Sequence, residues 1–174
     1  MKLFLEKPEQ KPHDTRWWVC GKAMKFLVTR ELGRLSRWLR ILGYDALYCR
    51  ENKKSTVIIA ALRDDRIVVT RNNVFLSDKA LKSVLIKYDD LKQQLTQLIC
   101  ECALTVLSEN MFTRCIVCNE PLYSVDKGII QSRVPAYVYS NQKIFFSCAI
   151  CKRIYWQGTH WGNVQEMMSA VEKH

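Results

Sequence analysis

Two pairs of cysteines have the spacing of metal ligands. Cys115 and Cys118 form one CxxC motif, Cys148 and Cys151 form a second, and residues 119–147 separate them. Each CxxC can turn its two sulfurs toward one point, so two such turns on facing hairpins supply four thiolates in a tetrahedron, which suits Zn²⁺. Four protein ligands leave no open coordination position, so we predict a structural zinc site. Iron or a redox-active dithiol pair is the alternative chemistry.

Arginines gather on one side of a helix predicted between residues 30 and 42. Leucines recur there at spacings of three and four, so they share one face of a 3.6-residue helix, and the arginines fall on the opposite face. The leucines are Leu32, Leu35, Leu39 and Leu42, and the arginines are Arg30, Arg34 and Arg37, with Arg40 at the margin of their face. Clustered guanidinium groups without a lysine favour a phosphate-binding surface. A solvated polar face is the simpler alternative.

Strands and helices alternate between residues 24 and 107, which predicts an α/β fold. Apolar runs predict strands, and periodic stretches predict helices. Ser55 is a plausible N-cap for one of these helices, and the Asp89-Asp90 pair precedes another. The expected strands are 26–28, 44–49, 67–70 and 83–87, and the expected helices are 30–42, ended by Gly43, then 55–62 and 91–107. This alternation gives an open sheet of roughly four parallel strands flanked by helices.

Ligands of such a sheet bind outside the carboxyl ends of its strands, where the strand order switches. The residues expected there are Thr29 and Arg30, residues 49–54, and Thr70, Arg71 and Asn72. Arg71 therefore joins the helix arginines as a candidate phosphate contact, with Lys53 and Lys54 at the rim.

The pattern changes from about residue 108. Turns, β-like runs at 137–139 and 144–146, and the cysteine pairs replace the α/β alternation, and a short helix is expected at 161–173. These features are the make-up of a zinc ribbon. We therefore expect three parts: an N-terminal extension (1–23), an α/β domain (24–107), and a small Cys₄ zinc ribbon with a short C-terminal helix (108–174).

Composition narrows the choice of partner and compartment. The chain has 174 residues and a net charge of +10, which favours a polyanion, with nucleic acid preferred to a membrane. The longest purely apolar run, Val57 to Leu62, is far shorter than the roughly 20 residues that span a bilayer. The N-terminus has too short an apolar run for a secretory signal. We expect a cytoplasmic protein, in whose reducing environment paired cysteines bind metal rather than form disulfides.

Several motifs occur in the order found in a known family. KFLVTRELGRLSRWLRILGYDALY, RIVVTRN, RCIVCNEPL, RVPAYVY and CKRIYWQGTHW together resemble the Mut-seven C-terminal RNase domain family, over about residues 25–162. The resemblance implies a PIN-like α/β fold with a zinc ribbon at its C-terminal end. It also implies RNA processing, with a metal-dependent endoribonuclease activity of the kind found in PIN relatives.

The same resemblance identifies three positions where acids should hold Mg²⁺ or Mn²⁺ for hydrolysis of a phosphodiester. These positions carry Thr29, Ser55 and Asn72, none of which supplies a negative charge. Glu31 is a possible substitute, as is Glu51; Asp89 and Asp90 follow a later strand and are better explained as helix caps. We expect Mg²⁺ or Mn²⁺ as a cofactor only if the site is active.

We therefore interpret the chain as an RNA-binding PIN-like protein with a degenerate nuclease site, a pseudoenzyme. One alternative is an active metal-dependent endoribonuclease that uses replacement ligands. The other is a protein–protein adaptor in which the zinc ribbon and the N-terminal arm dock a partner.

Overall fold

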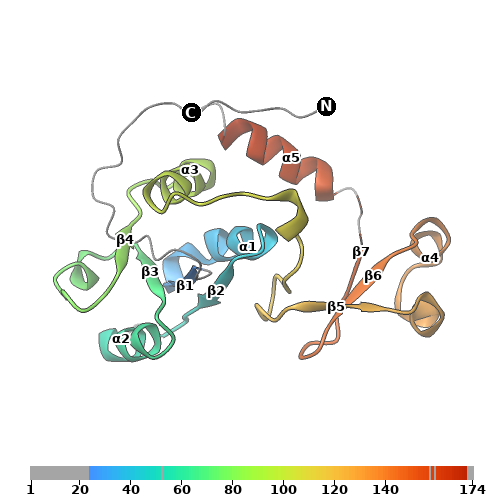
Figure 1. The fold of residues 1–174 in the computed structure, drawn as a ribbon, viewed down its shortest axis with the longest axis horizontal. Helices are drawn as coiled ribbons and strands as arrows, with labels where there is room; N and C mark the ends of the chain where they lie inside the picture. Colours follow the sequence, from blue (N-terminus) through green and yellow to red (C-terminus); the bar gives the residue numbers. More distant parts are fainter. Residues whose placement is uncertain (1–23, 52, 157, 159, 172–174) are drawn as a thin grey trace.

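The computed structural model describes residues 24–51, 53–156, 158 and 160–171, so the expected N-terminal extension lies outside the described residues. Four short strands form a parallel sheet in the order β2-β1-β3-β4 (Figure 1). They are β1 (Lys25–Val28), β2 (Asp45–Tyr48), β3 (Ile67–Thr70) and β4 (Ser83–Leu85). The chain moves from β1 to one side for β2 and to the other side for β3. The strand order therefore switches between β1 and β3, as an open α/β sheet with a ligand site requires.

Helices cover both faces of the sheet. They are α1 (Gly33–Ile41), α3 (Leu91–Glu101) and α5 (His160–Val171) on one face and α2 (Lys54–Arg63) on the other (Figure 1). Alternation along β1 explains the two cores, since Phe26 and Val28 pack with α1 and α3 while Leu27 packs against α2. The predicted α/β sheet flanked by helices is confirmed. No described helix has the length and apolar character that crossing a membrane would need.

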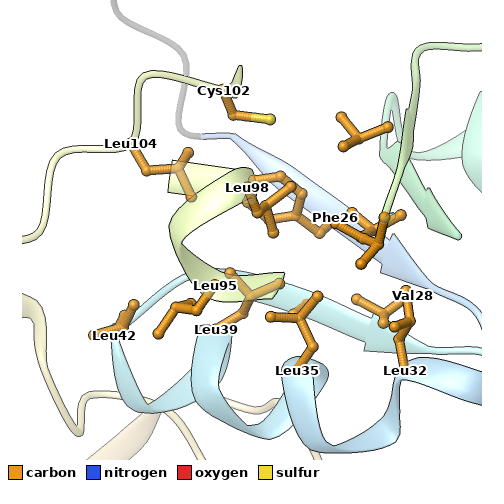
Figure 2. Packing of buried hydrophobic residues seen from close by; sticks show 14 of the residues in the cluster. Phe26, Val28, Leu32, Leu35, Leu39, Leu42, Leu95, Leu98, Cys102 and Leu104 are labelled. Atoms are coloured by element: carbon orange, nitrogen blue, oxygen red, sulfur yellow. The ribbon is translucent and has the colours of Figure 1, made fainter. Parts of the chain in front are cut away.

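Helix α1 forms as its leucine spacing predicted. A 3₁₀ turn (Arg30–Leu32) leads into it, and Leu32, Leu35, Leu39 and Leu42 are all at most 2% exposed, in one cluster with residues of β1 and α3 (Figure 2). Gly43 follows the helix with a φ of +91°, and a Cβ there would lie 2.2 Å from the Asn110 carbonyl oxygen. A larger residue at this position would therefore push the chain that leads into the cysteine pairs away from α1.

The cysteine-bearing part of the chain forms a second, antiparallel sheet in the order β5-β6-β7. Its strands are β5 (Leu122–Val125), β6 (Phe145–Cys148) and β7 (Ile154–Trp156). A small core of Ile130, Val134, Val138 and Phe145 lies beneath it. Beyond β7 the chain returns to the parallel sheet, because α5 buries Val164, Met168 and Val171 in the α1–α3 cluster.

Three local expectations differ from the structure. Residues 137–139 lie in a short helix, α4 (Ala136–Asn141), rather than a strand. Pro135 precedes this helix at the N-cap position, and Val138 is buried in the small core. Helix α3 ends at Glu101 and does not continue to residue 107. Two residues after its end, Ala103 adopts a left-handed conformation with a φ of 47°. Ser55 is not an N-cap: α2 begins after Lys53, whose side chain makes no capping hydrogen bond.

Candidate functional sites at the cysteine pairs and the strand ends

The four cysteines of the CxxC pairs come together as predicted. The sulfurs of Cys115, Cys118, Cys148 and Cys151 all lie within 4.8 Å of one another, and the Cys115 and Cys151 Sγ atoms are 3.6 Å apart. Zn–S bonds of about 2.3 Å place the sulfurs of a tetrahedral site about 3.8 Å apart. The donor type and spacing therefore fit a zinc ion, and the four cysteines could hold one.

Both cysteine pairs use the same backbone turn. In each, the residue after the second cysteine donates its N–H to the carbonyl of the first, Asn119 to Cys115 and Lys152 to Cys148. Both donors adopt left-handed conformations, with φ of 69° and 57°. The cysteine spacing did not predict a role for Asn119. Asparagine tolerates a left-handed conformation, so an asparagine directly after a CxxC pair could have predicted this turn.

The surroundings of the thiols favour a bound cation. Burial opposes ionisation of the Cys115 thiol, but hydrogen bonds lower its pKa to about 7. The strongest of these is to the Tyr155 hydroxyl, 3.1 Å from Cys115 Sγ. Burial, together with hydrogen bonding to Cys151 and the charge of Cys115, raises the pKa of Cys118 to about 12. A divalent cation bound by these sulfurs as thiolates would therefore release protons on binding.

Arg40 does not lie at the margin of a solvent-exposed arginine face, which corrects the sequence-based expectation. Its side chain is buried, with the residue only 5% exposed. Nε donates to the Ala46 carbonyl, and Nη1 donates to the carbonyls of Ile116 and Val117, all at 2.9 Å. Arg40 thus joins α1, the edge strand β2 and the first cysteine turn, and it is not available to contact RNA.

The charge of Arg40 also matters to the cysteine site. Burial lowers the pKa of this guanidinium, while the charges of Cys115 and Cys118 oppose that shift. Four thiolates around Zn²⁺ carry a net charge of −2, and a buried cation beside them offsets part of that charge.

Asn119 forms a second connection from the first cysteine turn to the parallel sheet. Its Oδ1 accepts from the Ala46 N–H at 2.9 Å, and its Nδ2 donates to Asp45 Oδ1 at 2.7 Å. Asp45 also forms an ion pair with Arg66, at the start of β3. The amino-terminal ends of β2 and β3 and the first cysteine turn are therefore held in one polar network.

A second candidate site is a hollow of about 440 Å³ at the carboxyl ends of β1 and β3. Its lining residues are Thr29, Glu31, Glu51, Val57, Arg71, Asn72 and Phe75. The hollow lies beside the switch in strand order, where the sequence predicted a ligand site. Two carboxylates, from Glu31 and Glu51, face this space together with the amide of Asn72 and the cation of Arg71.

Glu31 is an exposed residue, but one oxygen of its carboxylate is held by the strand ends. Its Oε1 accepts hydrogen bonds from the Thr29 hydroxyl at 2.6 Å, the Thr70 hydroxyl at 3.1 Å and the Arg71 N–H at 2.9 Å. Burial raises the pKa of this carboxyl, but these donors outweigh burial and lower it below the ordinary value. Glu31 is therefore a charged group at neutral pH whose inner oxygen is already used by the protein.

The positions where the family resemblance expected acids are only partly brought together. Thr29 and Asn72 line the hollow, whereas Ser55 is exposed in the first turn of α2 and is not a lining residue. The Asn72 Oδ1 atom already accepts a hydrogen bond from the Val74 N–H, two residues along the chain. Asp90 caps α3 by accepting from the Gln93 N–H, which bears out the predicted capping role.

These groups fit Mg²⁺ or Mn²⁺ poorly. Such hard cations are held in proteins by several oxygen ligands, usually with carboxylates among them. Within the part of the chain that the structure describes, the four cysteines are the one group of three or more His, Cys, Asp or Glu side chains that comes together. The strand-end hollow offers two carboxylates, and one oxygen of Glu31 is already hydrogen-bonded to three donors.

The remaining predicted phosphate contacts lie on accessible surface. Arg30, Arg34 and Arg37 are exposed, and none forms an ion pair with an acidic side chain of the described residues. Arg71 is also exposed and forms an ion pair with Asp89 across the hollow rim. We use the term arginine surface below for Arg30, Arg34 and Arg37.

Comparison with known proteins identifies one family. The family model of the Mut7-C RNAse domain matches residues 24–168, which include the parallel sheet, both cysteine pairs and most of α5. Searches of curated proteins and of solved structures return no match to the chain.

Proposed function

This chain belongs to the Mut7-C RNAse domain family, and we propose that it is an RNA-binding member whose nuclease site is degenerate. The family supports a nuclease-like or RNA-related function. In our proposal, RNA binds across the arginine surface and the strand-end hollow without being cut.

The state of Glu31 is the observation that carries this proposal. Thr29, at the first expected acid position, is a hydrogen-bond donor to Glu31 rather than a second carboxylate. An acid there would repel Glu31 unless a cation lay between them. The present arrangement satisfies the Glu31 charge without metal, which supports a site that has lost its metal ligands.

Binding in this proposal is electrostatic. Three exposed arginines have no acidic partners among the described residues, and the strand-end hollow presents a further arginine, Arg71. Guanidinium groups form forked hydrogen bonds with phosphate oxygens, and phosphate contacts release counterions from single-stranded RNA. Affinity should therefore fall steeply with salt.

Charge reversal of the arginine surface tests the binding. We expect Arg34→Glu with Arg37→Glu to weaken binding of a fluorescent single-stranded RNA at least tenfold and to reduce the salt slope by about 1.4, or about 0.7 per lost phosphate contact. Lys79→Glu with Lys143→Glu is the charge-matched control, since both lysines are exposed and lie outside the surface and the hollow. Equal effects of the two double variants, or none from the first, would contradict the proposal.

We propose further that the metal at the cysteine pairs is zinc and that its role is structural. A site with four protein ligands has no position for water or substrate. Elemental analysis of the purified chain should give one zinc per molecule, and iron in its place would overturn this assignment.

An active nuclease is the second candidate, favoured by one observation, that Glu31 and Glu51 both line the hollow. RNA incubated with the protein and Mn²⁺ separates the candidates. Chelator-sensitive cleavage that Glu31→Gln abolishes would establish the active enzyme. Uncut RNA from the wild type, with cleavage gained by combined Thr29→Asp, Ser55→Asp and Asn72→Asp, would establish a degenerate site.

A further inference from the structure

The antiparallel sheet carries a hollow of its own, of about 430 Å³, that shares no lining residue with the strand-end hollow. Its chemistry comes from three cations, Arg133, Lys152 and Arg153, and from two consecutive aromatic residues of β7, Tyr155 and Trp156. We call it the ribbon hollow. A volume of this order suits a ligand the size of one nucleotide.

The cations of the ribbon hollow have no acidic side chain beside them in its lining. All three are exposed, and within the described residues none forms an ion pair. Arg133 donates through Nη2 to the Lys152 carbonyl, so a segment remote in sequence is fixed beside the second cysteine turn. The positive charge is therefore concentrated by the fold and left for an anion.

The aromatic residues are held rigidly where they meet these cations. The Tyr155 hydroxyl lies 3.1 Å from Cys115 Sγ, so its ring is anchored to the metal site. Trp156 packs against Phe145, with ring centroids 6.5 Å apart. Both residues are only half-buried and line the hollow. Because consecutive strand residues point to opposite faces of a sheet, the two rings lie on either side of the edge strand β7, where each offers a restrained aromatic surface for a base.

We propose that the ribbon hollow binds one nucleotide of a single-stranded RNA, with its phosphate against Lys152 and Arg153 and its base against the Tyr155–Trp156 edge. This inference rests on the proposed RNA-binding function and adds a second, separate contact to it. Arginine and lysine alone would equally suit an acidic peptide, but the aromatic edge beside them suits a base. RNA bound at both sites would run from the arginine surface of α1 to the antiparallel sheet.

A single charge reversal at the ribbon hollow tests the inference in the full-length, zinc-loaded chain. We expect Arg153→Glu to weaken binding of a fluorescent single-stranded RNA roughly five- to tenfold and to lower the salt slope by about 0.7. Lys143→Glu is the matched control, because Lys143 is exposed and lies outside the hollow lining. RNA containing 4-thiouridine should cross-link on irradiation to the peptide with Tyr155 and Trp156, and Arg153→Glu should reduce that cross-link.

Each other outcome would overturn the inference. If Arg34→Glu with Arg37→Glu abolishes binding while Arg153→Glu and Lys143→Glu both leave it unchanged, the arginine surface binds RNA and the ribbon hollow does not. Arg153→Glu that spares RNA but prevents binding of labelled polyglutamate would identify a site for acidic protein segments. Arg153→Glu that lowers zinc content would assign the cations to the charge of the metal site. A wild type that binds no RNA would overturn both this inference and the proposed function.

Discussion

The sequence suggested a metal site at the cysteine pairs and another at the strand ends, but the two places differ in what surrounds the candidate ligands. At the cysteine site all four donors are present, and the buried cation Arg40 and the Tyr155 hydroxyl support their negative charge. At the strand ends one oxygen of the Glu31 carboxylate is held by protein donors. The first arrangement is incomplete without a cation, whereas the second is complete without one.

In our proposal, this difference would let a binding surface persist after a catalytic metal site is lost. Replacing an acid by threonine removes repulsion and supplies a hydrogen-bond donor, so the strand ends stay ordered. Replacing a cysteine would leave three thiols around a gap. We therefore expect substitutions at the cysteine site to damage the fold and substitutions at the strand ends to have smaller effects.

Loss of a zinc ligand should have the largest effect. Cys148 is fully buried at the end of β6, and Cys148→Ser should abolish zinc binding and unfold the antiparallel sheet, because metal binding supplies several kcal/mol of the folding energy of such small units. Elemental analysis and amide hydrogen exchange would check this. Cys100→Ser, at an exposed cysteine outside the site, is the control. Retained zinc and unchanged protection of β5–β7 in Cys148→Ser would contradict a structural metal.

Removal of Arg40 should have the next largest effect. Arg40→Ala leaves the carbonyls of Ala46, Ile116 and Val117 without their donor, so we expect a loss of about 2–4 kcal/mol in unfolding free energy. Denaturant unfolding would measure it, with Arg37→Ala, an exposed arginine of the same helix, expected to change stability by under about 0.5 kcal/mol. Equal effects at the two positions would show that Arg40 does not join the two sheets.

Neutralising Glu31 should have a smaller and pH-dependent effect. Glu31→Gln should lower the unfolding free energy by about 0.5–1 kcal/mol at neutral pH, because a charged acceptor of three hydrogen bonds becomes neutral at a residue whose interactions are screened by solvent. The native pKa of Glu31 is below its ordinary value of 4.5, so its contribution to stability is fully present above the ordinary value and is lost as pH falls through the lowered native pKa. Unfolding of both proteins at neutral and strongly acidic pH would check this.

A Glu31→Gln protein that is more stable than wild type at neutral pH would show that the carboxylate is strained, as in a site awaiting a metal ion. Glu51→Gln, at the exposed glutamate across the hollow, should leave stability nearly unchanged.

The periodicity of apolar residues and the spacing of motifs in the sequence predicted the fold well. The leucine spacing predicted the buried face of α1, the β-branched run predicted β3, and the paired cysteines predicted a ligand set. The structure confirms all three. The position of the strand-end hollow followed from strand order, because carboxyl ends of parallel strands meet at one edge.

The features that spacing did not predict depend on contacts between distant segments. Arg40 falls at the edge of a helical wheel, and only the packing of the first cysteine turn against α1 makes it a buried donor. The position of the Glu31 carboxylate depends on the Thr70 hydroxyl and the Arg71 N–H at the end of another strand. Residues 137–139 have β-forming side chains, but burial of Val138 in the small core stabilises a helix.

The most direct test of the account compares the two sites in one crystal. Crystals of the zinc-loaded protein soaked in Mn²⁺ would be measured for anomalous scattering at the zinc and manganese absorption edges. The account predicts zinc bound by Cys115, Cys118, Cys148 and Cys151, and no manganese beside Thr29 and Glu31. Manganese bound between Glu31 and Glu51 would contradict the central claim that the strand ends have lost their metal site.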